Sequence, residues 1–353
     1  MTPATFPAVR GDVLLVGGYG AGNLGDEAIL AGLLRSVPDE VRRLSVVTRD
    51  PPETRRRAAD LTADVPLRPV PATVPALAGA LRSEDAFVVG GGGIFSRYVG
   101  PAARKIPYYA LAVHALGKPV HWTAVGVYRS TPARVRPALF AALERAASVS
   151  VRDPASQRFL DAHGVSDVRL VEDPAMRLTP DRAAGRRHLA EAGFDPDAPL
   201  LGVAARRVLD VDRDADLQVA YRSVADAFDR RGWQLAFLPF CRHPTARVEQ
   251  DQRVCTPLAA RYGGRVLTVT DPQALMGVVA HCDALVATRL HSMLFALRAD
   301  VPFAAVTYAE KVESLLEAYG VADRGVPLDA VGDGRLLASL ERAVDAAEGR
   351  AVR

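Results

Sequence analysis

The chain has 353 residues, more than one ordinary hydrophobic core accommodates, and this length predicts two domains. Apolar residues make up 49% and charged residues 24%, which is typical of a globular protein with sizeable buried cores. The net charge of +3, from 44 basic and 41 acidic residues, gives no basis for bulk nucleic-acid binding.

Cysteine usage and the start of the chain indicate where the protein works. The cysteines at 241, 255 and 282 have neither metal-site spacing nor an even number for disulfides, so they fit a reducing compartment. The first ten residues lack the basic and apolar segments of a signal peptide, and no apolar run reaches the roughly 18 residues that cross a bilayer. We expect a cytoplasmic protein whose substrate can still lie at the inner face of the membrane.

Buried strands and amphipathic helices alternate along the first half of the chain. Strands are predicted at residues 13–16, 44–48, 65–70, 86–89, 119–127, 148–151 and 168–171. Helices are predicted at residues 26–34, 106–116, 132–147 and 154–163. Such alternation predicts a parallel sheet with helices on both faces, and so a Rossmann-like domain over 1–180.

A second series follows residues 175–200, where Arg, Ala, Asp and Pro break the pattern and indicate a domain junction. Strands are predicted at 200–204, 234–238, 266–269, 284–287 and 302–306, and helices at 219–231, 247–262, 272–281, 290–297, 311–319 and 332–351. We expect a second Rossmann-like domain over 195–335 and a terminal helix over 336–353 that can pack back on the first. The cleft between two facing halves is the expected active site.

Two glycine-rich segments follow predicted strands. Residues 17–27 place Asn23, Asp26 and Glu27 at the start of a helix, where carboxylates oppose a pyrophosphate and can cap the helix. Residues 90–93 are four consecutive glycines, of which Gly91 and Gly92 lie in the middle. A run of this kind lets the backbone lie against a ligand or the opposite domain, with a tight turn as the structural alternative.

Cationic residues follow other strands. Arg152 ends a short strand, ahead of Asp153, which is placed to cap the next helix. Arg289 and His291 follow another strand, where arginine offers a planar fork to phosphate or carboxylate and histidine can exchange a proton. The chain has three lysines, and Lys311 is the one that follows a strand in the second half. Arg206 has a similar context, and the sequence does not separate it from Arg207.

Taken in order, these segments resemble the polysaccharide pyruvyltransferase family over nearly the whole chain. The similar segments are Gly20-Ala-Gly-Asn-Leu-Gly-Asp-Glu27, the glycines at 90–93, Ser150-Val-Arg-Asp153, Asp173-Pro174, Arg289-Leu-His291 and Lys311-Val-Glu313. The resemblance implies two Rossmann-like domains similar to GT-B glycosyltransferases. It also implies phosphoenolpyruvate as donor co-substrate, a ketal product on a hexose or N-acetylhexosamine of a cell-surface glycan, and released phosphate.

The same resemblance distributes roles. It implies that the donor site is formed by Arg152, Arg206, Arg289, His291 and Lys311. All of these except Arg152 belong to the second domain, the expected donor side of the cleft. It implies that Asn23, Asp26 and Glu27 lie near the acceptor, which can be lipid-linked, and that Gly91 and Gly92 contact substrate. The segment after Pro239 matches the family poorly, so no acceptor contacts are assigned there.

On chemical grounds we expect His291 to be the general acid–base, and Asp26 or Glu27 to activate the acceptor hydroxyl. No metal or further cofactor is called for, because the chain lacks metal-ligand motifs. Two alternatives stay open: a nucleotide-sugar glycosyltransferase of the same shape, with Glu310 or Glu313 on the ribose, and a non-catalytic partner subunit. Homo-oligomerisation is left open as well.

Overall fold

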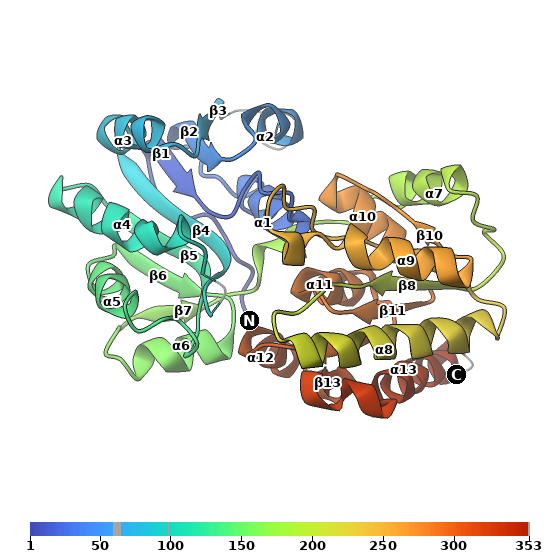
Figure 1. Cartoon of the computed structure of the whole chain (residues 1–353). Helices are drawn as coiled ribbons and strands as arrows, with labels where there is room; N and C mark the ends of the chain where they lie inside the picture. Colours follow the sequence, from blue (N-terminus) through green and yellow to red (C-terminus); the bar gives the residue numbers. More distant parts are fainter. Residues whose placement is uncertain (59–64, 98, 352–353) are drawn as a thin grey trace. The chain divides into compact units, whose positions relative to one another are not determined.

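The computed structural model describes residues 1–58, 65–97 and 99–351, and Figure 1 shows the chain coloured along its length. Two compact units divide the chain, Met1–Leu178 and Thr179–Arg353. The boundary between them falls inside the segment 175–200 that the sequence indicates as the junction. Positions 352–353, which end the predicted terminal segment 336–353, lie outside the described residues.

The first unit contains a seven-stranded sheet in which every strand pair is parallel. The strand order is β3-β2-β1-β4-β5-β6-β7. The strands are β1 (Gly11–Val16), β2 (Val41–Thr48), β3 (Leu67–Pro71), β4 (Ala86–Phe95), β5 (Val120–Val127), β6 (Ser148–Val151) and β7 (Val168–Leu170).

Helices connect these strands, as parallel pairing requires. They are α1 (Leu24–Leu34), α2 (Pro51–Ala58), α3 (Val74–Ser83), α4 (Ile106–Ala115), α5 (Arg136–Glu144), α6 (Pro154–Asp161) and the short 3₁₀ turns η1 (Ala103–Lys105) and η2 (Pro174–Arg177). Asparagine and aspartate side chains start two of them: Asn23 accepts from the Gly25 N–H, and Asp153 accepts from the Ser156 N–H.

The second unit repeats the arrangement with six parallel strands in the order β10-β9-β8-β11-β12-β13. The strands are β8 (Leu200–Ala204), β9 (Gln234–Phe237), β10 (Arg265–Val266), β11 (Ala284–Ala287), β12 (Phe303–Thr307) and β13 (Gly325–Pro327). The helices are α7 (Arg182–Glu191), α8 (Val211–Asp229), α9 (Gln252–Tyr262), α10 (Pro272–Val279), α11 (Leu290–Ala299), α12 (Glu310–Ala318) and α13 (Arg335–Ala351), with 3₁₀ turns η3 (Arg247–Glu249), η4 (Ala322–Arg324) and η5 (Leu328–Asp333).

Both sheets share one topological feature. The strand order reverses direction once in each, between β1 and β4 in the first unit and between β8 and β11 in the second. In open α/β sheets the loops at the carboxyl ends of the strands part at this point, and ligands bind there. The fold therefore directs attention to the loops that follow these four strands.

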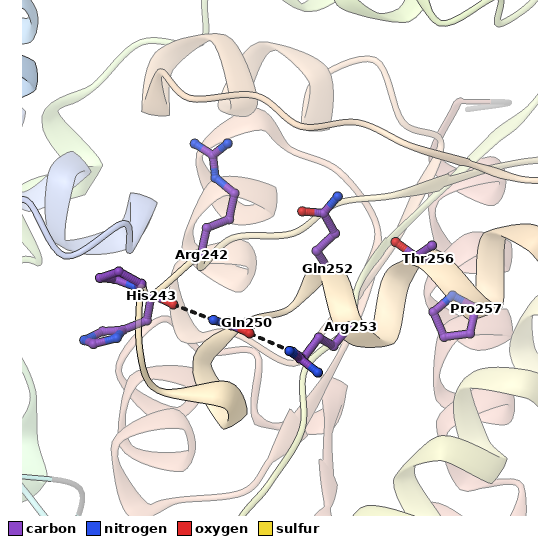
Figure 2. Close-up of a pocket in the computed structure, with 8 residues that line it drawn as sticks. Arg242, His243, Gln250, Gln252, Arg253, Thr256 and Pro257 are labelled. Atoms are coloured by element: carbon purple, nitrogen blue, oxygen red, sulfur yellow. Dashed lines mark hydrogen bonds between the residues drawn. The ribbon is translucent and has the colours of Figure 1, made fainter.

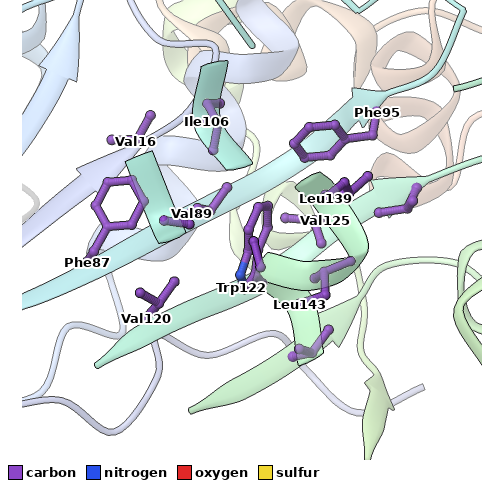
Figure 3. Close-up of a cluster of buried hydrophobic side chains, with 14 of the residues drawn as sticks. Val16, Phe87, Val89, Phe95, Ile106, Val120, Trp122, Val125, Leu139 and Leu143 are labelled. Carbon is purple, nitrogen blue, oxygen red and sulfur yellow. The ribbon is translucent and has the colours of Figure 1, made fainter. Parts of the chain in front are cut away.

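Strand alternation sorts the core of the first unit into two clusters, one on each face of the sheet. Leu14 and Val16 of β1 belong to one cluster, and Val13 and Leu15 belong to the other. Figure 3 shows the first of these clusters, in which Trp122 of β5 lies with its ring centroid 5.8 Å from that of Phe95. Burial on both faces explains why these strands read as continuous apolar runs in the sequence.

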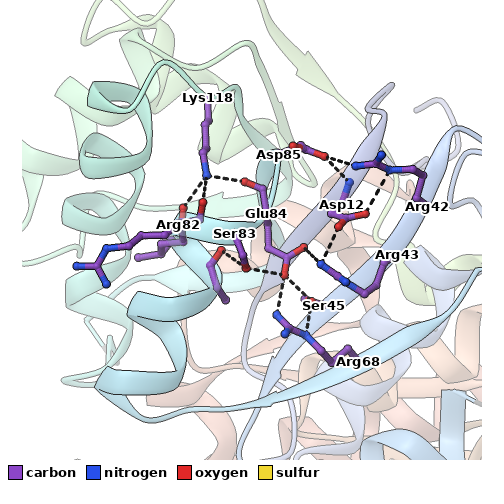
Figure 4. A network of polar contacts seen from close by, with 12 residues as sticks. Asp12, Arg42, Arg43, Ser45, Arg68, Arg82, Ser83, Glu84, Asp85 and Lys118 are labelled. Atoms are coloured by element: carbon purple, nitrogen blue, oxygen red, sulfur yellow. Dashed lines mark hydrogen bonds and ion pairs between the residues drawn. The ribbon is translucent and has the colours of Figure 1, made fainter.

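A polar network, drawn in Figure 4, lies at the amino ends of the strands of the first unit. Glu84 accepts hydrogen bonds from Ser45 and Arg68, and Lys118 donates to the carbonyls of Leu81, Arg82 and Glu84 at the end of α3. Ligands bind at the opposite, carboxyl edge of such a sheet. Lys118 is thus a structural lysine that caps α3.

The two chain ends of the first unit meet. Thr2 forms a parallel bridge with Val171, and the Glu172 N–H donates to the Thr2 carbonyl at 2.8 Å. Pro174 lies against α1 at Gly32, where a Cβ would stand 1.9 Å from the Pro174 carbonyl oxygen. The last residues of this unit therefore pack against its first helix, α1.

The structure differs from the sequence-based elements at several points. Helix α7 forms inside the segment 175–200, where the sequence predicts no helix. It packs on α10 through Gly185 and Gly277 and not through an apolar stripe, so its sequence lacks the helical pattern of apolar residues. Helices α2 and α3 and strand β13 are additional elements, and α8 begins eight residues before its predicted start at 219. The contacts of α13 lie with α8, β11, β12 and β13 of the second unit.

Candidate functional site

At the reversal point of the first unit, a glycine-rich loop carries β1 into α1. Asn23 caps the helix, and its Nδ2 donates to Asp26 Oδ2 at 2.8 Å. A Cβ at Gly18 would stand 2.7 Å from the same carboxylate oxygen, so the loop backbone lies directly against Asp26. The amide of Asn23 and the half-buried carboxylate of Asp26 thus form one polar pair at the start of the helix.

The predicted glycine run is part of β4 itself, not of a loop after it. Gly91 and Gly92 have φ of +39° and +95°, and the register of β4 against β5 shifts after Gly92. A Cβ at Gly91 would stand 2.3 Å from the Ile29 side chain, and one at Gly92 would stand 3.6 Å from Asp26 Oδ1. Gly91 therefore admits α1, while Gly92 brings backbone next to Asp26.

Glu27 has a different environment from its neighbour Asp26. It is buried, its Oε1 accepts from the Gly20 N–H at 2.7 Å, and its Oε2 lies 3.0 Å from Arg57 Nη1. Burial raises the pKa of Glu27 above its usual value, although Arg57 and the Gly20 N–H act in the opposite direction. Glu27 therefore stabilises the conformation of the glycine-rich loop, and Asp26 is the more accessible carboxylate of the two.

Arg152 lies in the first unit at the end of β6, and its side chain is buried. Its Nη1 donates to Asp173 Oδ2 at 2.7 Å, and Asp173 in turn caps η2. The neighbouring Asp153 accepts from the Tyr128 hydroxyl at 2.7 Å. Asp173, Asp153 and a polarised Tyr128 outweigh burial and keep the pKa of Arg152 above its usual value, so the guanidinium is charged.

The remaining predicted donor residues lie in the second unit, after adjacent strands. Arg206 follows β8, Arg289 and His291 follow β11, and Lys311 begins α12 after β12. Arg206 Nη2 lies 3.2 Å from Glu249 Oε1, and Arg289 Nη1 pairs with the other oxygen, Oε2. One carboxylate therefore bridges the two arginines of the reversal point.

Asp251 fixes the orientation of Arg289. Its carboxylate accepts from Arg289 Nε at 3.1 Å and from Nη2 at 2.5 Å, so the two groups form a bidentate pair. The same carboxylate accepts from the backbone N–H groups of Phe240 and Cys241 after β9. Burial acts to lower the pKa of Arg289, but Asp251 and Glu249 raise it well above its usual value. Arg289 is thus a charged, fixed group.

Tyr308, directly after β12, completes the cation cluster, which we define as Arg206, Arg289, Lys311 and Tyr308. The Tyr308 ring lies 4.7 Å from the Arg206 guanidinium carbon and 5.4 Å from Lys311 Nζ. Burial alone would raise the pKa of this phenol, but Lys311, Arg206 and Arg289 outweigh burial and lower it to about 8. The three cations of the cluster therefore act together on the Tyr308 hydroxyl.

His291 lies in the first turn of α11 and is buried. Its helix is anchored at the cluster, because the Ser292 hydroxyl donates to the Arg289 carbonyl at 2.6 Å and Thr288 pairs with the hydroxyl of Tyr221 at 2.8 Å. Spacing of two residues from Arg289 places His291 on the same loop-to-helix turn. A buried imidazole on a rigid turn beside cations suits proton transfer to a bound anion.

The structure separates two arginines that the sequence does not. Arg207 turns to α8, where its Nη2 lies 2.7 Å from Asp214 Oδ2. Arg206 donates from Nε to the Arg207 carbonyl at 2.9 Å and directs its Nη2 to Glu249. Arg206 is therefore the member of the cluster, and Arg207 is a half-exposed residue that pairs with Asp214 of α8.

A hollow of about 540 Å³ opens beside α9 in the second unit (Figure 2). Residues 242–251, which we term the β9–α9 segment, contribute part of its wall, and the first turns of α9 contribute the rest. The lining residues are Arg242, His243, Pro244, Gln250, Gln252, Arg253, Thr256 and Pro257. The lining includes two guanidiniums and no carboxylate, whereas the cation cluster is balanced by Glu249 and Asp251.

Three functional residues were missed by the sequence reasoning. Tyr308 directly follows a buried strand, which is the same signal that selected Arg206 and Lys311. Glu249 and Asp251 fall within the predicted helix 247–262, and no local pattern indicates that their side chains turn back to β11. Their role arises from tertiary structure alone.

Among the described residues, no group of three or more His, Cys, Asp or Glu side chains could hold a metal ion. Within the same residues, no helix combines the length and the apolar character that crossing a membrane requires.

Two sequence comparisons relate most of the chain to known proteins. The family model described as Polysaccharide pyruvyl transferase matches residues 23–310. The Amylovoran biosynthesis protein AmsJ of Erwinia amylovora is 21% identical over 94% of this chain and 92% of its own.

Solved structures of similar fold include the UDP-GlcNAc 2-epimerase of Methanocaldococcus jannaschii, with a TM-score of 0.61, 12% identity, and coverage of 96% of this chain and 92% of that one. The ADP-heptose LPS heptosyltransferase II of E. coli gives a TM-score of 0.56, 12% identity, and coverage of 96% and 99%. At such identities the likeness concerns the fold alone. It confirms the predicted two-domain α/β fold similar to GT-B glycosyltransferases.

Proposed function

We propose that this chain, which belongs to the polysaccharide pyruvyl transferase family, transfers the pyruvyl group of phosphoenolpyruvate to a sugar. The acceptor is a hexose or N-acetylhexosamine of a cell-surface glycan or its lipid-linked precursor, and the product is a cyclic ketal with release of phosphate. The similarity to an amylovoran biosynthesis protein supports a role in polysaccharide synthesis.

The observation that carries this proposal is the cation cluster. Arg206, Arg289 and Lys311 come from three adjacent strand ends, and the ring of Tyr308 lies against two of them. Phosphoenolpyruvate bears a carboxylate and a phosphate close together, about three negative charges near neutral pH. A site for it needs several converging cations, which is what the ends of β8, β11 and β12 provide.

The chemistry assigns the proton transfers. His291 donates a proton to the methylene carbon of the donor, which becomes a methyl group and leaves the enol carbon electrophilic. A sugar hydroxyl attacks this carbon while Asp26 takes up its proton. The bond between this carbon and the phosphate oxygen then breaks, phosphate departs with the proton that Asp26 took up, and a second hydroxyl closes the ketal as its proton returns to His291. The cations offset the negative charge that develops on the leaving phosphate.

Asp26 is the better candidate for the hydroxyl-activating base than Glu27. Glu27 is occupied by the Gly20 N–H and Arg57, so its removal would deform the loop. Asp26 is half-buried, is oriented by the Asn23 amide and lies next to Gly92, where a hydroxyl can approach. We assign to Asn23 the task of positioning Asp26, and to Gly92 that of admitting the acceptor.

We place the proposed reaction in the cytoplasm. Peripheral contact with the membrane would depend on the lipid that carries the acceptor. Cys241, Cys255 and Cys282 are free and buried, and burial raises the pKa of each thiol, so they are inert structural residues. This agrees with a reducing compartment but does not by itself identify one.

The test combines binding with turnover. Calorimetry should detect binding of phosphoenolpyruvate and none of a UDP-sugar, and incubation with a panel of lipid-linked and model glycosides should release phosphate and add the ketal mass to one of them. His291→Ala should lower turnover by about 10²–10⁴-fold with the circular dichroism spectrum unchanged. Binding of a UDP-sugar without phosphoenolpyruvate would favour a glycosyltransferase, and near-normal turnover of the variant would remove His291 from the mechanism.

A further inference from the structure

The β9–α9 segment turns back on itself, because Arg242 and Gln250 form an antiparallel bridge and the His243 N–H donates to the Glu249 carbonyl at 3.3 Å. Its last residue, Asp251, is buried, accepts from the backbone of Phe240 and Cys241, and donates its own N–H to the Cys241 carbonyl at 3.0 Å. Between these anchors the chain forms the single 3₁₀ turn η3, in which no residue is buried. A movement of this turn would leave the anchored Asp251 in place.

Glu249, the last residue of that turn, reaches into the cation cluster. Each of its carboxylate oxygens pairs with a different arginine, Oε1 with Arg206 and Oε2 with Arg289. Its side chain is 27% exposed, whereas those of the two arginines are 4% and 9% exposed. Glu249 is therefore the most solvent-accessible of the three paired side chains.

The two acidic partners of Arg289 differ in kind. Asp251 is fully buried and satisfies two backbone N–H groups in addition to the guanidinium, so it is a permanent part of the fold. Glu249 is partly exposed, and its carboxylate pairs with the two arginines. Burial acts to raise the pKa of Glu249, but Arg289 and Arg206 overcome it and lower the pKa to about 2. Glu249 is thus a charged group at every physiological pH.

We propose that Glu249 is a built-in competitor, a carboxylate that occupies the place of the donor's acidic group and is displaced when the donor binds. The inference rests on the proposed function for the identity of the donor. The two-oxygen, two-arginine arrangement is the one that a carboxylate or a phosphate of the donor would reproduce. Glu249 thereby sets the affinity of the site and its preference for highly charged ligands.

The physical reason for that preference is a comparison of charges. With Glu249 in place, the three cations Arg206, Arg289 and Lys311 face two carboxylates, so a monoanion that replaces Glu249 gains little attraction. A ligand with about three negative charges places one group on the arginines and leaves further charge for Lys311. The displaced turn η3 then moves toward solvent, where a carboxylate is fully hydrated. Small inorganic monoanions are consequently rejected.

The test is the isosteric substitution Glu249→Gln in the full chain, with phosphoenolpyruvate and inorganic phosphate as separate probes in calorimetry. The amide keeps the shape of the side chain but loses its charge, so both probes should bind about tenfold more tightly than to the unchanged protein. Weaker binding of both probes would overturn the proposal, because it would show that Glu249 organises the arginines for the ligand. Glu249→Ala provides a second variant, for which the same sign is expected.

Asp251→Asn is the matched control. It also removes a carboxylate from Arg289, but from the buried, permanent position, so we expect lower thermal stability and weaker binding of both probes. Tighter binding to this variant as well would overturn a distinct role for Glu249, since any loss of negative charge would then suffice.

The two probes separate this proposal from the function on which it rests. If Glu249→Gln binds inorganic phosphate more tightly while neither protein binds phosphoenolpyruvate, the competitor stands and the donor is a different phosphate compound. If both proteins bind phosphoenolpyruvate with the same affinity, the donor stands and the competitor is refuted.

Discussion

The two reversal points of this molecule have the same topology and opposite chemistry. In the first unit the loop after β1 and the glycine-containing part of β4 bring together an amide, a carboxylate and glycine backbone at Asn23, Asp26 and Gly92. In the second unit the loops after β8 and β11 bring together Arg206 and Arg289, balanced in part by Glu249. One arrangement suits a neutral, hydroxyl-bearing ligand, and the other suits an anion.

The difference teaches that the fold selects the place while the loops select the ligand. Both sheets use the strand order that opens a gap at the carboxyl ends of the central strands, so each unit offers one such place for a ligand. Mutations should therefore separate the two halves of the reaction. Changes in the first unit should reduce turnover without altering donor affinity, and changes in the second should reduce donor affinity.

The largest effect is expected from Asp26→Asn. If Asp26 takes the proton of the acceptor hydroxyl, its amide should lower turnover by about 10²–10⁴-fold, because the amide cannot act as a base. The dissociation constant of phosphoenolpyruvate, measured by calorimetry, should stay unchanged. A substantial loss of donor binding would contradict the division of roles between the two units.

An intermediate effect is expected from Arg206→Gln, with Arg207→Gln as its neighbour control. Loss of one charge-assisted contact to the donor should weaken phosphoenolpyruvate binding by about 10–100-fold. Arg207 pairs with Asp214 instead, so Arg207→Gln should leave donor binding within about twofold and only modestly lower the melting temperature. Equal losses in both variants would show that general positive charge, not the geometry of Arg206, attracts the donor.

The smallest effect is a pH dependence that Tyr308→Phe should remove. The positive charges of Lys311, Arg206 and Arg289 hold the pKa of Tyr308 at about 8, so above that pH a phenolate forms beside them. A bound anionic donor raises this pKa again, and donor affinity should therefore fall as pH rises through 8, by up to about tenfold per pH unit. The phenylalanine variant should lose this alkaline limb while keeping the ring against Arg206. An unchanged limb would assign the titration to another group.

How much of this site the sequence predicts depends on the kind of element involved. The strands β8, β11 and β12 are buried on both faces and read as short apolar runs, so the residues after them, Arg206, Arg289 and Lys311, could be placed at one sheet edge in advance. Tyr308 was within reach of the same rule but was passed over because a tyrosine after a strand carries no charge signal.

Other features could not be predicted because they depend on contacts between distant segments. Glu249 and Asp251 act on Arg289 across about forty residues of sequence, from a segment whose regular structure is a single 3₁₀ turn and one bridge. Helix α7 escaped detection because its packing on α10 uses close backbone approach at Gly185 and Gly277, which leaves no apolar periodicity to read.

The closure of the first unit on itself has a consequence for how the chain is made. Thr2 pairs with Val171, and Pro174 covers α1 at Gly32. The helix that bears Asp26 is synthesised well before its last neighbour, because Pro174 follows Gly32 by 142 residues (174 − 32). Contacts between residues so far apart in sequence slow folding. The surface of α1 that Pro174 covers therefore stays exposed during much of synthesis. The same meeting of termini makes the loops elsewhere in this unit suitable points at which to open a circularly permuted chain.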